Sequence, residues 1–490
     1  MIRRFIAIAV RAGAPLLPLA ASIPALAQSL PQRAPVDRVL SRLAPERSVP
    51  GDWPRYCADD AMSGQATGET AITAATAPRL APVWTAQLPG SVASSPTVVG
   101  RSVYVGDWSG QESRVDAATG TILASVNLGQ TLMPQCNPDP QGITSAPAYA
   151  DGHLFLAGGD DGFYALDAQT LEILWRRSLG DNSPTGGYYA FCSPLIVAGR
   201  VLQGISSNCD NPFIPGKLFA MDRKTGELLA QADLVPDSMP GGGVWSSPSV
   251  DLQSGQVFVT TASGVALDDG YAYSIVRLAL SDLTILDSWR EDPHGVPDAD
   301  WGSSPTLFTD PAGRRLVGAG EKDGYYYAFA RGNLAAGPVW RAPVAQGGEC
   351  PQCGAGVLST AAFDGARLYT AGGIPPDWTR PSIVGSVVAL DPATGAILWR
   401  FVVLEGPVIA PISMANGVVF AAGLHSVVAL DAETGTLLWE FDDPAILYGG
   451  VAISRGRIYF GDMDGRLYAF GVPGVSAPSG GTSPGAASEP

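Results

Sequence analysis

Residues 387–401 read VVALDPATGAILWRF, and residues 427–441 repeat this text almost letter for letter as VVALDAETGTLLWEF. The shared core is A-x-D-x-x-T-G-x-x-x-W, with tryptophan eight positions after aspartate, as in Asp391–Trp399 and Asp431–Trp439. A chain that repeats a segment in this way uses one structural unit several times. This internal repeat therefore decides the fold.

Drifted copies of the motif run through most of the chain. Counted at the aspartate position, the copies fall at 116, 167, 222, 281, 330, 391, 431 and 471, at intervals of 40 to 61 residues. Some copies depart from the motif. Leu171 replaces the glycine after Asp167, and Ala124 and Ala230 replace the tryptophans after Asp116 and Asp222. Ser281 replaces the aspartate eight residues before Trp289, and the copy that ends at Trp340 has two extra residues.

Each copy is preceded by the same pattern. A segment with serine and proline, such as SSPTVV or CSPLIV, comes before an alternating apolar stretch such as HLFLAGG, and a turn of the Asp-Gly type leads into the motif. Asp-Gly between alternating apolar runs is a β-hairpin signal. Each unit is therefore expected to hold four short antiparallel strands, as a β-propeller blade does.

The two ends of the repeat region complement each other. The last copy, at 471, has no strand after it, while a spare strand that contains Trp84 (APVWTAQL, 81–88) precedes the first copy. Pairing of residues 82–88 with 466–471 would complete the last blade and remove the exposed edges of an open ring. The sequence thus predicts an all-β, eight-bladed propeller over residues 52–472, closed by its N-terminal strand.

Composition and charge narrow the class of protein. The 490 residues include 59 glycines and 41 prolines, which suits short strands joined by tight turns. A net charge of −16 argues against nucleic acid and anionic membrane surfaces as partners, because both attract basic patches. Beyond the N-terminus, no apolar run is long enough to span a membrane.

The N-terminus has the features of a secretory signal. MIRRFIAIAVRAGAPLLPLAASIPALAQ has a charged start, an apolar centre and a small-x-small end. We expect a signal peptide over 1–27, a linker over 28–51, a Gly/Ser/Pro tail over 473–490, and a periplasmic or secreted protein. A membrane anchor is the alternative for 1–27, but Arg11 and three prolines interrupt the stretch.

An exported chain favours disulfides. Six cysteines allow many pairings, which sequence alone does not resolve. Local spacing suggests Cys192–Cys209 and Cys350–Cys353, and it leaves Cys57 and Cys136 unassigned.

The repeated motif, its eight copies and the spare strand resemble the quinoprotein-type eight-bladed propeller over roughly residues 52–472. In that family the repeated tryptophan stacks between neighbouring blades against the Thr-Gly turn. The resemblance implies that these tryptophans build the ring and take no part in chemistry. Within the family, the chain looks most like the polyvinyl-alcohol-dehydrogenase-like members.

Three stretches resemble segments that hold pyrroloquinoline quinone (PQQ) in quinoprotein alcohol dehydrogenases. GGGVWSSPSVD (241–251) matches the segment with a stacking tryptophan, which implies Trp245. DADWGSSPTLF (298–308) matches the segment with the catalytic base, which implies Asp300, with Asp298 as a weaker candidate. VGAGEKDGYYYAF (317–329) matches the segment whose cation touches the quinone and the base, which implies Lys322.

Each of these residues also has a purely structural explanation. Trp245 would then be a core aromatic of an inner strand, Asp300 part of an acidic loop that caps a strand, and Lys322 a hairpin lysine that faces water. If the resemblance holds, Lys322 would favour the charged form of Asp300 and polarise the quinone oxygen.

The resemblance is incomplete in the segments that bind the metal ion in this family. ISSNCDNP (205–212) resembles the segment with a serine contact and a calcium ligand, which implies Ser207 for the cofactor and Asp210 for calcium. TASGV, however, puts Val265 where the family has an asparagine ligand. The family's adjacent cysteine pair is absent, and CPQCG (350–354) lacks the histidine of a haem c motif, so we expect no covalent haem.

The sequence supports two main hypotheses about the function of the protein. The first is a periplasmic PQQ-dependent dehydrogenase that oxidises a small or polymeric alcohol and passes electrons to a separate acceptor such as a cytochrome c. The second is a propeller that lost the cofactor and acts as a scaffold, as the outer-membrane assembly propeller does. Binding of polymer or carbohydrate at the ring mouth has no distinctive sign. Trp245, Asp300 and Lys322 favour the enzyme, whereas Val265 and the missing cysteines count against it.

Overall fold

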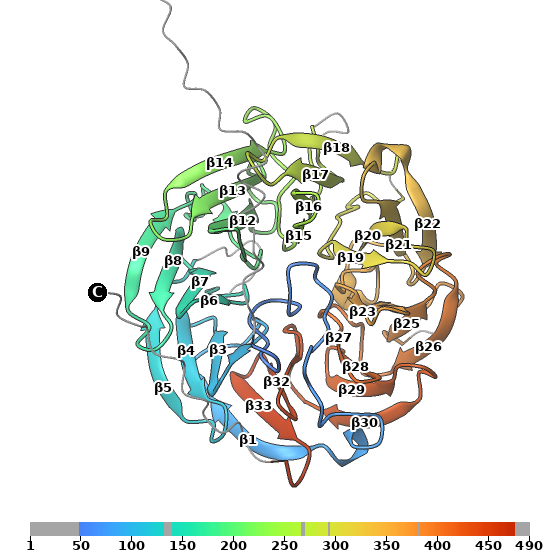
Figure 1. Ribbon diagram of the computed structural model, residues 1–490. Coiled ribbons are helices and arrows are strands. Elements are labelled where there is room, and N and C mark those ends of the chain that lie inside the picture. The colour runs from blue at the N-terminus through green and yellow to red at the C-terminus, as the bar shows by residue number, and fades with distance from the viewer. Residues whose placement is uncertain (1–48, 132–139, 266–269, 293–294, 380–381, 476–490) are drawn as a thin grey trace, which may run out of the picture. The chain divides into compact units, whose positions relative to one another are not determined.

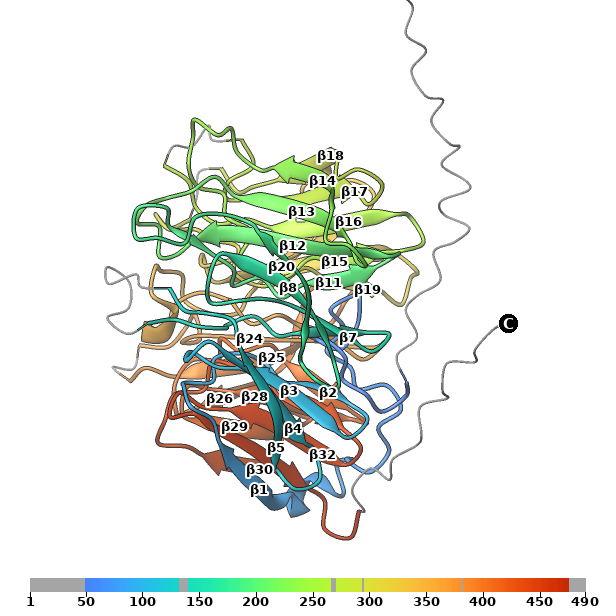
Figure 2. The same cartoon turned by 90° about the vertical axis from the view of Figure 1, so that its left-hand side faces the viewer.

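The computed structural model describes residues 49–131, 140–265, 270–292, 295–379 and 382–475, so the predicted signal peptide and Cys136 lie outside it. Among these residues, eight antiparallel sheets follow one another around a common axis (Figure 1). Seen from the side, β3, β4 and β5 of one sheet lie beside β32 and β1 of its neighbour (Figure 2). The predicted eight-bladed all-β fold is confirmed.

Seven blades use strands that are consecutive in the chain. Blade 1 consists of β2 (Thr97–Val99), β3 (Ser102–Gly106), β4 (Gln111–Asp116) and β5 (Ile122–Asn127), and blade 2 of β6 (Ala148–Ala150), β7 (His153–Ala157), β8 (Gly162–Asp167) and β9 (Ile173–Ser178). Blade 3 consists of β11 (Leu195–Val197), β12 (Arg200–Ser207), β13 (Lys217–Asp222) and β14 (Leu228–Asp233), with the extra strand β10 (Tyr188–Tyr189). Blade 4 consists of β15 (Ser249–Asp251), β16 (Gln256–Thr260), β17 (Ile275–Ala279) and β18 (Ile285–Trp289). Blades 5 to 7 consist of β19 (Thr306–Thr309), β20 (Arg315–Gly320), β21 (Tyr325–Ala330) and β22 (Pro338–Pro343); β23 (Ala362–Phe363), β24 (Leu368–Gly372), β25 (Gly385–Leu390) and β26 (Ile397–Val403); and β27 (Ser413–Ala415), β28 (Val418–Ala422), β29 (Ser426–Asp431) and β30 (Leu437–Asp442).

Blade 8 joins the two ends of the repeat region. It contains β31 (Ala452–Ser454), β32 (Arg457–Gly461), β33 (Arg466–Gly471) and, as its outer strand, β1 (Ala81–Gln87). β1 pairs antiparallel with β33 from Ala81 opposite Gly471 to Gln87 opposite Arg466. The predicted closure by the N-terminal strand is confirmed.

Helices are almost absent from the described residues. Three single-turn 3-10 helices occur, η1 (Ala77–Arg79), η2 (Leu334–Ala336) and η3 (Pro351–Cys353). None of the helices in the described part of the chain is long and apolar enough to cross a membrane.

The repeated motif forms the junction between neighbouring blades. Asp431 Oδ1 accepts hydrogen bonds from Glu433 N, Thr434 N and Thr434 Oγ1 at 2.9 to 3.1 Å, which fixes the turn. The carbonyl just after the aspartate accepts the indole N–H of the preceding blade's tryptophan. These pairs are Trp84–Ala117, Trp175–Arg223, Trp340–Pro392 and Trp399–Ala432, at 3.0 to 3.1 Å.

The motif glycine is required for two reasons. Gly435 has a φ of +71°, which favours glycine, and a Cβ at this position would lie 2.7 Å from the Trp399 ring. The tryptophan therefore lies directly on the glycine, and the structural role that was expected of these tryptophans is observed.

Two junctions replace this tryptophan–glycine pair. Ala124 stands at the tryptophan position, and Leu171 of the next blade takes the positive φ of the glycine (+60°) and packs in the same cluster. Ala230 and Leu283 (φ +59°) form the same combination between blades 3 and 4. The large side chain has moved from the strand to the turn, which explains why tryptophan and glycine are lost together.

Trp289 does not dock in the predicted way. Ala279, rather than Ser281, occupies the aspartate position, because its N–H donates to Thr284 O as that of Asp391 donates to Ala396 O. The tryptophan position therefore falls on Asp287, which pairs with Arg277 at 2.7 Å. Trp289 lies two residues further along β18, where its ring packs at 5.1 to 6.0 Å from aromatic rings of Trp301, Tyr327 and Phe329.

Residues 51–69, here called the axial strap, contact the innermost strand of every blade. Figure 1 shows this segment in blue at the centre of the ring. The hydrogen-bonded pairs, from blade 1 to blade 8, are Trp53–Val98, Pro54–Tyr149, Arg55–Ile196, Asp60–Val250, Ala61–Leu307, Ser63–Phe363, Gly64–Met414 and Gly51–Ser454. The strap thereby satisfies backbone groups that the free edges of these strands would otherwise leave unpaired.

We expect Gly435→Ala to cost about 3 kcal/mol of unfolding free energy, because the methyl group would overlap the Trp399 ring in addition to straining the backbone. Gly417→Ala is the matched control, since Gly417 has a φ of +78° but no atom within 4 Å of a Cβ. It should cost only about 1 kcal/mol. Urea unfolding of both variants checks this, and equal losses would show that the contact with tryptophan adds nothing.

Candidate active site

A cavity of about 480 Å3 lies on the propeller axis, within the usual range for small-molecule sites. We call it the axial cavity. Segments that precede the innermost strands, and the loop that follows β12, reach the same end of the blades, because these strands are antiparallel. The residues that line it are Tyr56, Ala93, Ser95, Trp108, Gln141, Thr144, Ala146, Phe191, Ser193, Cys209, Trp245, Ser246, Ser247, Gly302, Ser304, Gln352, Leu358, Ile409, Pro411 and Tyr448.

The serines of the repeated Ser/Pro segments form a hydrogen-bonded belt around this cavity. The amide of Ser193 donates to Ser247 Oγ at 3.0 Å, and the amide of Ser247 donates to Ser304 Oγ at 2.8 Å. The amide of Ser304 donates to Thr360 Oγ1 at 3.0 Å. Tyr56 of the axial strap approaches the same Thr360 hydroxyl at 3.1 Å. These bonds join blades 3, 4, 5 and 6 at the cavity wall.

Trp245 lines the axial cavity, outside the tryptophan–glycine junctions. Its Nε1 is buried and has no hydrogen-bond partner among the described residues. A Cβ on Gly302 would lie 2.7 Å from its ring, so the indole packs directly against the segment that follows Asp300. A ligand acceptor in the cavity could take up the free indole N–H, whereas a core tryptophan would ordinarily have a partner.

Asp300 and Lys322 are in direct contact. Lys322 Nζ lies 2.7 Å from Asp300 Oδ2 and 2.6 Å from Asp298 Oδ2. Asp300 Oδ1 accepts the backbone N–H of Ser263, and Asp300 O accepts that of Lys322. The Asp300 side chain is 9% exposed and that of Asp298 is 32% exposed, so Asp300 is the more enclosed of the two candidate bases.

The electrostatics differ from the simple expectation that Lys322 keeps Asp300 ionised. Burial raises the pKa of Asp300 above its usual value, although the Lys322 ammonium opposes this shift. Burial alone would lower the pKa of Lys322, but the two carboxylates outweigh it and raise that pKa. Lys322 therefore stays an ammonium while Asp300 becomes more basic, and both changes suit a general base near neutral pH.

Asp210 belongs to the same cluster. Burial, together with the charges of Asp300 and Asp298, raises its pKa to about 7, and Lys322 only partly offsets them. The cluster of Asp210, Asp298, Asp300 and Lys322 has three carboxylates and one ammonium. When all are ionised it carries an excess of two negative charges, which a divalent cation would neutralise.

The predicted metal site is incomplete among the described residues. They contain no group of three or more His, Cys, Asp or Glu side chains placed to hold a metal ion. Val265 is exposed and offers no ligand. Asn208 Oδ1, two residues before Asp210, is buried and has no hydrogen-bond partner in the part of the chain that the structure describes. It is an oxygen of the kind that calcium accepts. Ser207 Oγ accepts the N–H of Ile214 at 2.8 Å.

The predicted disulfides are half right. Cys350 and Cys353 are bonded, so both sulfurs of the CPQC sequence are used in the bridge. The Cys192–Cys209 prediction is wrong, because Cys192 is a buried free thiol and Cys209 is disulfide-bonded elsewhere. Burial raises the pKa of the Cys192 thiol to about 12, and its Sγ accepts the N–H of Gly204 inside the blade. Cys57 is also a buried free thiol.

Several cavity residues were missed by sequence reasoning. Trp108 and Tyr448 line the axial cavity, as does Gln352 from the Cys350–Cys353 loop. Trp108 lies in the β3–β4 turn, eight residues before Asp116, and thus outside the tryptophan position of the repeat. Trp245 was predicted from its resemblance to a family segment, and no such resemblance pointed to Trp108. Tyr448 and Gln352 carry no comparable signal.

Asp300 and Lys322 do not themselves line the axial cavity, but their cluster adjoins it. Gly302 and Cys209 line the cavity, and they stand two residues after Asp300 and one before Asp210. The structure thus brings together Asp300, Lys322 and Asp210 beside the wall that contains Trp245.

Comparison with known proteins identifies the family. The chain belongs to the PQQ_2 family, described as outer membrane protein assembly factor BamB, whose model matches residues 136–316 and 327–473. A polyvinylalcohol dehydrogenase of Pseudomonas sp is 26% identical over 408 residues, which is 72% of this chain and 61% of that protein. The chain thus spans about three fifths of the length of this curated relative.

Solved structures show the same fold. The quinohemoprotein alcohol dehydrogenase from Comamonas testosteroni has a TM-score of 0.69 at 18% identity, over 91% of this chain and 84% of that one. BamB from Moraxella catarrhalis has a TM-score of 0.55 at 15% identity, over 81% of this chain and 99% of that one.

Asp210 gives a test of the cluster in metal-free buffer. Because its pKa rises from 3.8 to about 7 on folding, the folded state binds the proton more tightly, and stability from this group falls as pH rises through that range. Between pH 3.8 and about pH 7, we expect the Tm of the wild-type protein to decline more steeply with pH than the Tm of Asp210→Asn. Calcium at a pH above the upper value should raise the Tm of wild type and have less effect on the variant. Identical profiles in thermal melts would exclude both the raised pKa and the metal contact.

Proposed function

We propose that this chain is an exported, PQQ-dependent dehydrogenase that oxidises an alcohol, with a polymeric alcohol as the substrate class. The observation that carries the proposal is the enclosed carboxylate of Asp300. It lies between Ser263 N and Lys322 Nζ, beside a cavity wall formed by Trp245 and Gly302. The name of the Pseudomonas relative supports the polymeric substrate.

The residues present fit the quinone better than they fit a complete metal site. The axial cavity offers the Trp245 ring, a free indole N–H and several hydroxyl groups. No lysine or arginine is among its described lining residues, and Lys322, in the cluster that adjoins the cavity, is the cation we assign to the quinone. When bound, PQQ would supply the hydride acceptor.

The chain's own residues would carry the other steps. Asp300 would accept the proton of the alcohol hydroxyl, for which burial has raised its pKa. Lys322 would hold Asp300 in place and remain a cation beside the quinone oxygen. Asp210 would supply a metal ligand and Ser207 a contact to the cofactor. Electrons would leave to a separate acceptor such as a cytochrome c.

A scaffold function is the second candidate. The description of the matching family and the likeness to BamB support it. A scaffold, however, has no need of an enclosed carboxylate–ammonium pair beside a cavity. If calcium and PQQ restore neither quinone binding nor turnover, the scaffold function replaces the enzyme.

Asp298 provides the matched control for the catalytic base, since both carboxylates touch Lys322. After loading with PQQ and calcium, Asp300→Asn should lower alcohol-dependent dye reduction by about 10²- to 10⁴-fold, because the hydroxyl proton loses its acceptor. Asp298→Asn should lose less than about tenfold, because it only positions Lys322. An equal or larger loss in Asp298→Asn would reverse the assignment, and full activity in both variants would refute it.

A further inference from the structure

A second chamber of about 520 Å3 lies next to the axial cavity and shares Trp108 and Tyr448 with it. We call it the outer chamber. Its other walls include Ser91, Gln130, Ile446 and Met463, which belong to loops that adjoin blades 8 and 1. Gln130 is exposed and the other three are half-buried. Nearly half of the residues that line the axial cavity are buried, whereas none of the described residues that line the outer chamber is, so the outer chamber is the more accessible of the two.

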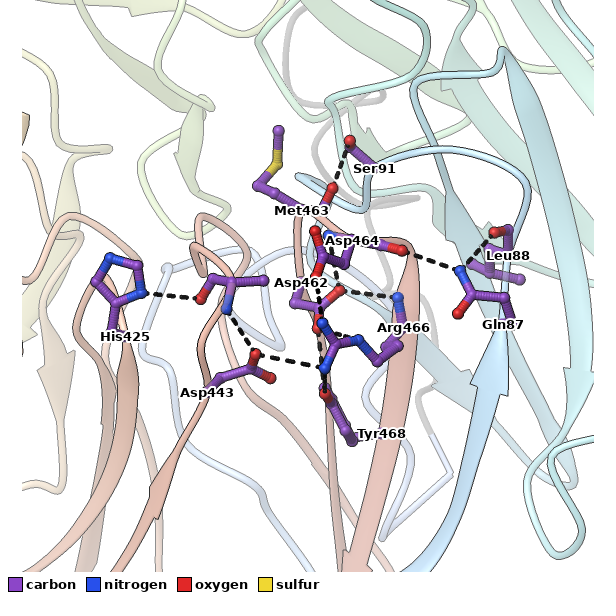
Figure 3. A network of polar contacts seen from close by, with 11 residues as sticks. Gln87, Leu88, Ser91, His425, Asp443, Asp462, Met463, Asp464, Arg466 and Tyr468 are labelled. Atoms are coloured by element: carbon purple, nitrogen blue, oxygen red, sulfur yellow. Dashed lines mark hydrogen bonds and ion pairs between the residues drawn. The ribbon is translucent and has the colours of Figure 1, made fainter.

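A polar network holds one wall of the outer chamber (Figure 3). Asp462 is fully buried, its Oδ2 pairs with Arg466 Nε at 3.1 Å, and its Oδ1 accepts the N–H of Arg466. Ser91 Oγ donates to Met463 O at 2.6 Å, and Met463 N donates to Ile446 O at 2.9 Å. In Figure 3 the Met463 side chain points away from the Asp462–Arg466 pair. Hydrogen bonds therefore hold the backbone of Met463 in place, and its apolar side chain is free to contact a ligand.

Trp108, which stands between the two chambers, is held on three sides. Its Nε1 donates to Thr144 Oγ1 at 3.0 Å, and its N–H donates to Ser91 O at 2.9 Å. Its carbonyl accepts a bond from Gln130 Nε2 at 2.5 Å. A ring held in this way offers a preformed contact surface, which lowers the entropic cost of binding.

The lining indicates the chemistry of the ligand. The described residues of the outer chamber are aromatic, aliphatic, proline, glycine, serine, glutamine and methionine, with no charged side chain. Such a surface suits a neutral chain whose carbon atoms contact apolar side chains and whose hydroxyl groups bond with serine and glutamine. An anionic or cationic ligand would lose its hydration without gaining a countercharge.

We infer that the outer chamber is a substrate subsite that binds the part of a hydroxylated chain adjoining the unit that reacts in the axial cavity. The inference rests on the proposed function for the reaction and on the shared Trp108 and Tyr448 walls for continuity between the chambers. Contacts in the outer chamber should therefore increase the affinity for long polyhydroxylated substrates, whereas small alcohols should bind without them.

The test compares a vinyl-alcohol decamer with isopropanol. Met463→Lys and Ile446→Lys put a charge into the outer chamber, and Leu404→Lys is the control, because Leu404 is 64% exposed and lines neither chamber. We expect both chamber variants to weaken decamer binding in calorimetry of the quinone-free protein by about tenfold, or about 1.4 kcal/mol. In the PQQ-loaded protein, both variants should lower kcat/KM for the decamer by a similar factor. The kcat/KM for isopropanol should stay within about twofold of the wild-type value.

Two outcomes overturn the subsite. One is an equal loss for decamer and isopropanol in the chamber variants, and the other is no loss for either. Circular dichroism of each variant shows that the fold is kept, and the second variant covers the case in which the first does not fold. If the loaded wild type oxidises no alcohol but the quinone-free protein binds the decamer through the outer chamber, the proposed function fails and the subsite stands.

Discussion

The pairing of β1 with β33 is the constraint on which the rest of the structure depends. Without β1, blade 8 would keep only the three strands that its own repeat supplies, and the ring would expose two open edges. The same junction places Trp84 on Ala117 of blade 1 and Trp439 on Leu80, which directly precedes β1. Closure therefore fixes the contacts on both sides of blade 8.

Closure also determines the site, because the axial cavity is lined by residues from all eight blades. The serine belt and the axial strap fix the blades relative to the axis, each through backbone groups that face it. Loops at one end are then free to carry charged and aromatic side chains. This division explains how Trp245, Asp300 and Lys322, far apart in sequence, come to lie around one end of the ring.

The sequence predicted the ring because its repeat is visible at every junction. Even the departures follow one rule, since Ala124 goes with Leu171 and Ala230 with Leu283. Trp289 was misplaced because Ala279, Leu283 and Asp287 occupy the aspartate, glycine and tryptophan positions of this copy, so no motif residue marks its register. The axial strap was not predicted, because it bonds mainly through its backbone, whose hydrogen bonds leave little trace in the sequence.

The site was only partly predictable. The contact of Lys322 with Asp300 follows from the resemblance, but the rise in the pKa of Asp300 and Asp210 depends on burial, which spacing does not reveal. Cys192 and Cys209 were paired on sequence distance alone. Within the blade, Cys192 instead receives the amide of Gly204. The outer chamber depends on loops from both ends of the repeat region, so no single stretch could have indicated it.

The central claim is that the axial cavity binds the quinone against Trp245. An equilibrium titration of the purified protein with PQQ in calcium buffer, followed by quinone absorbance and tryptophan fluorescence, tests it most directly. The account predicts saturable binding of one quinone per chain and a Kd that rises at least about tenfold in Trp245→Ala, because a stacking surface is lost. Absence of saturable binding in wild type, or an unchanged Kd in the variant, would contradict it.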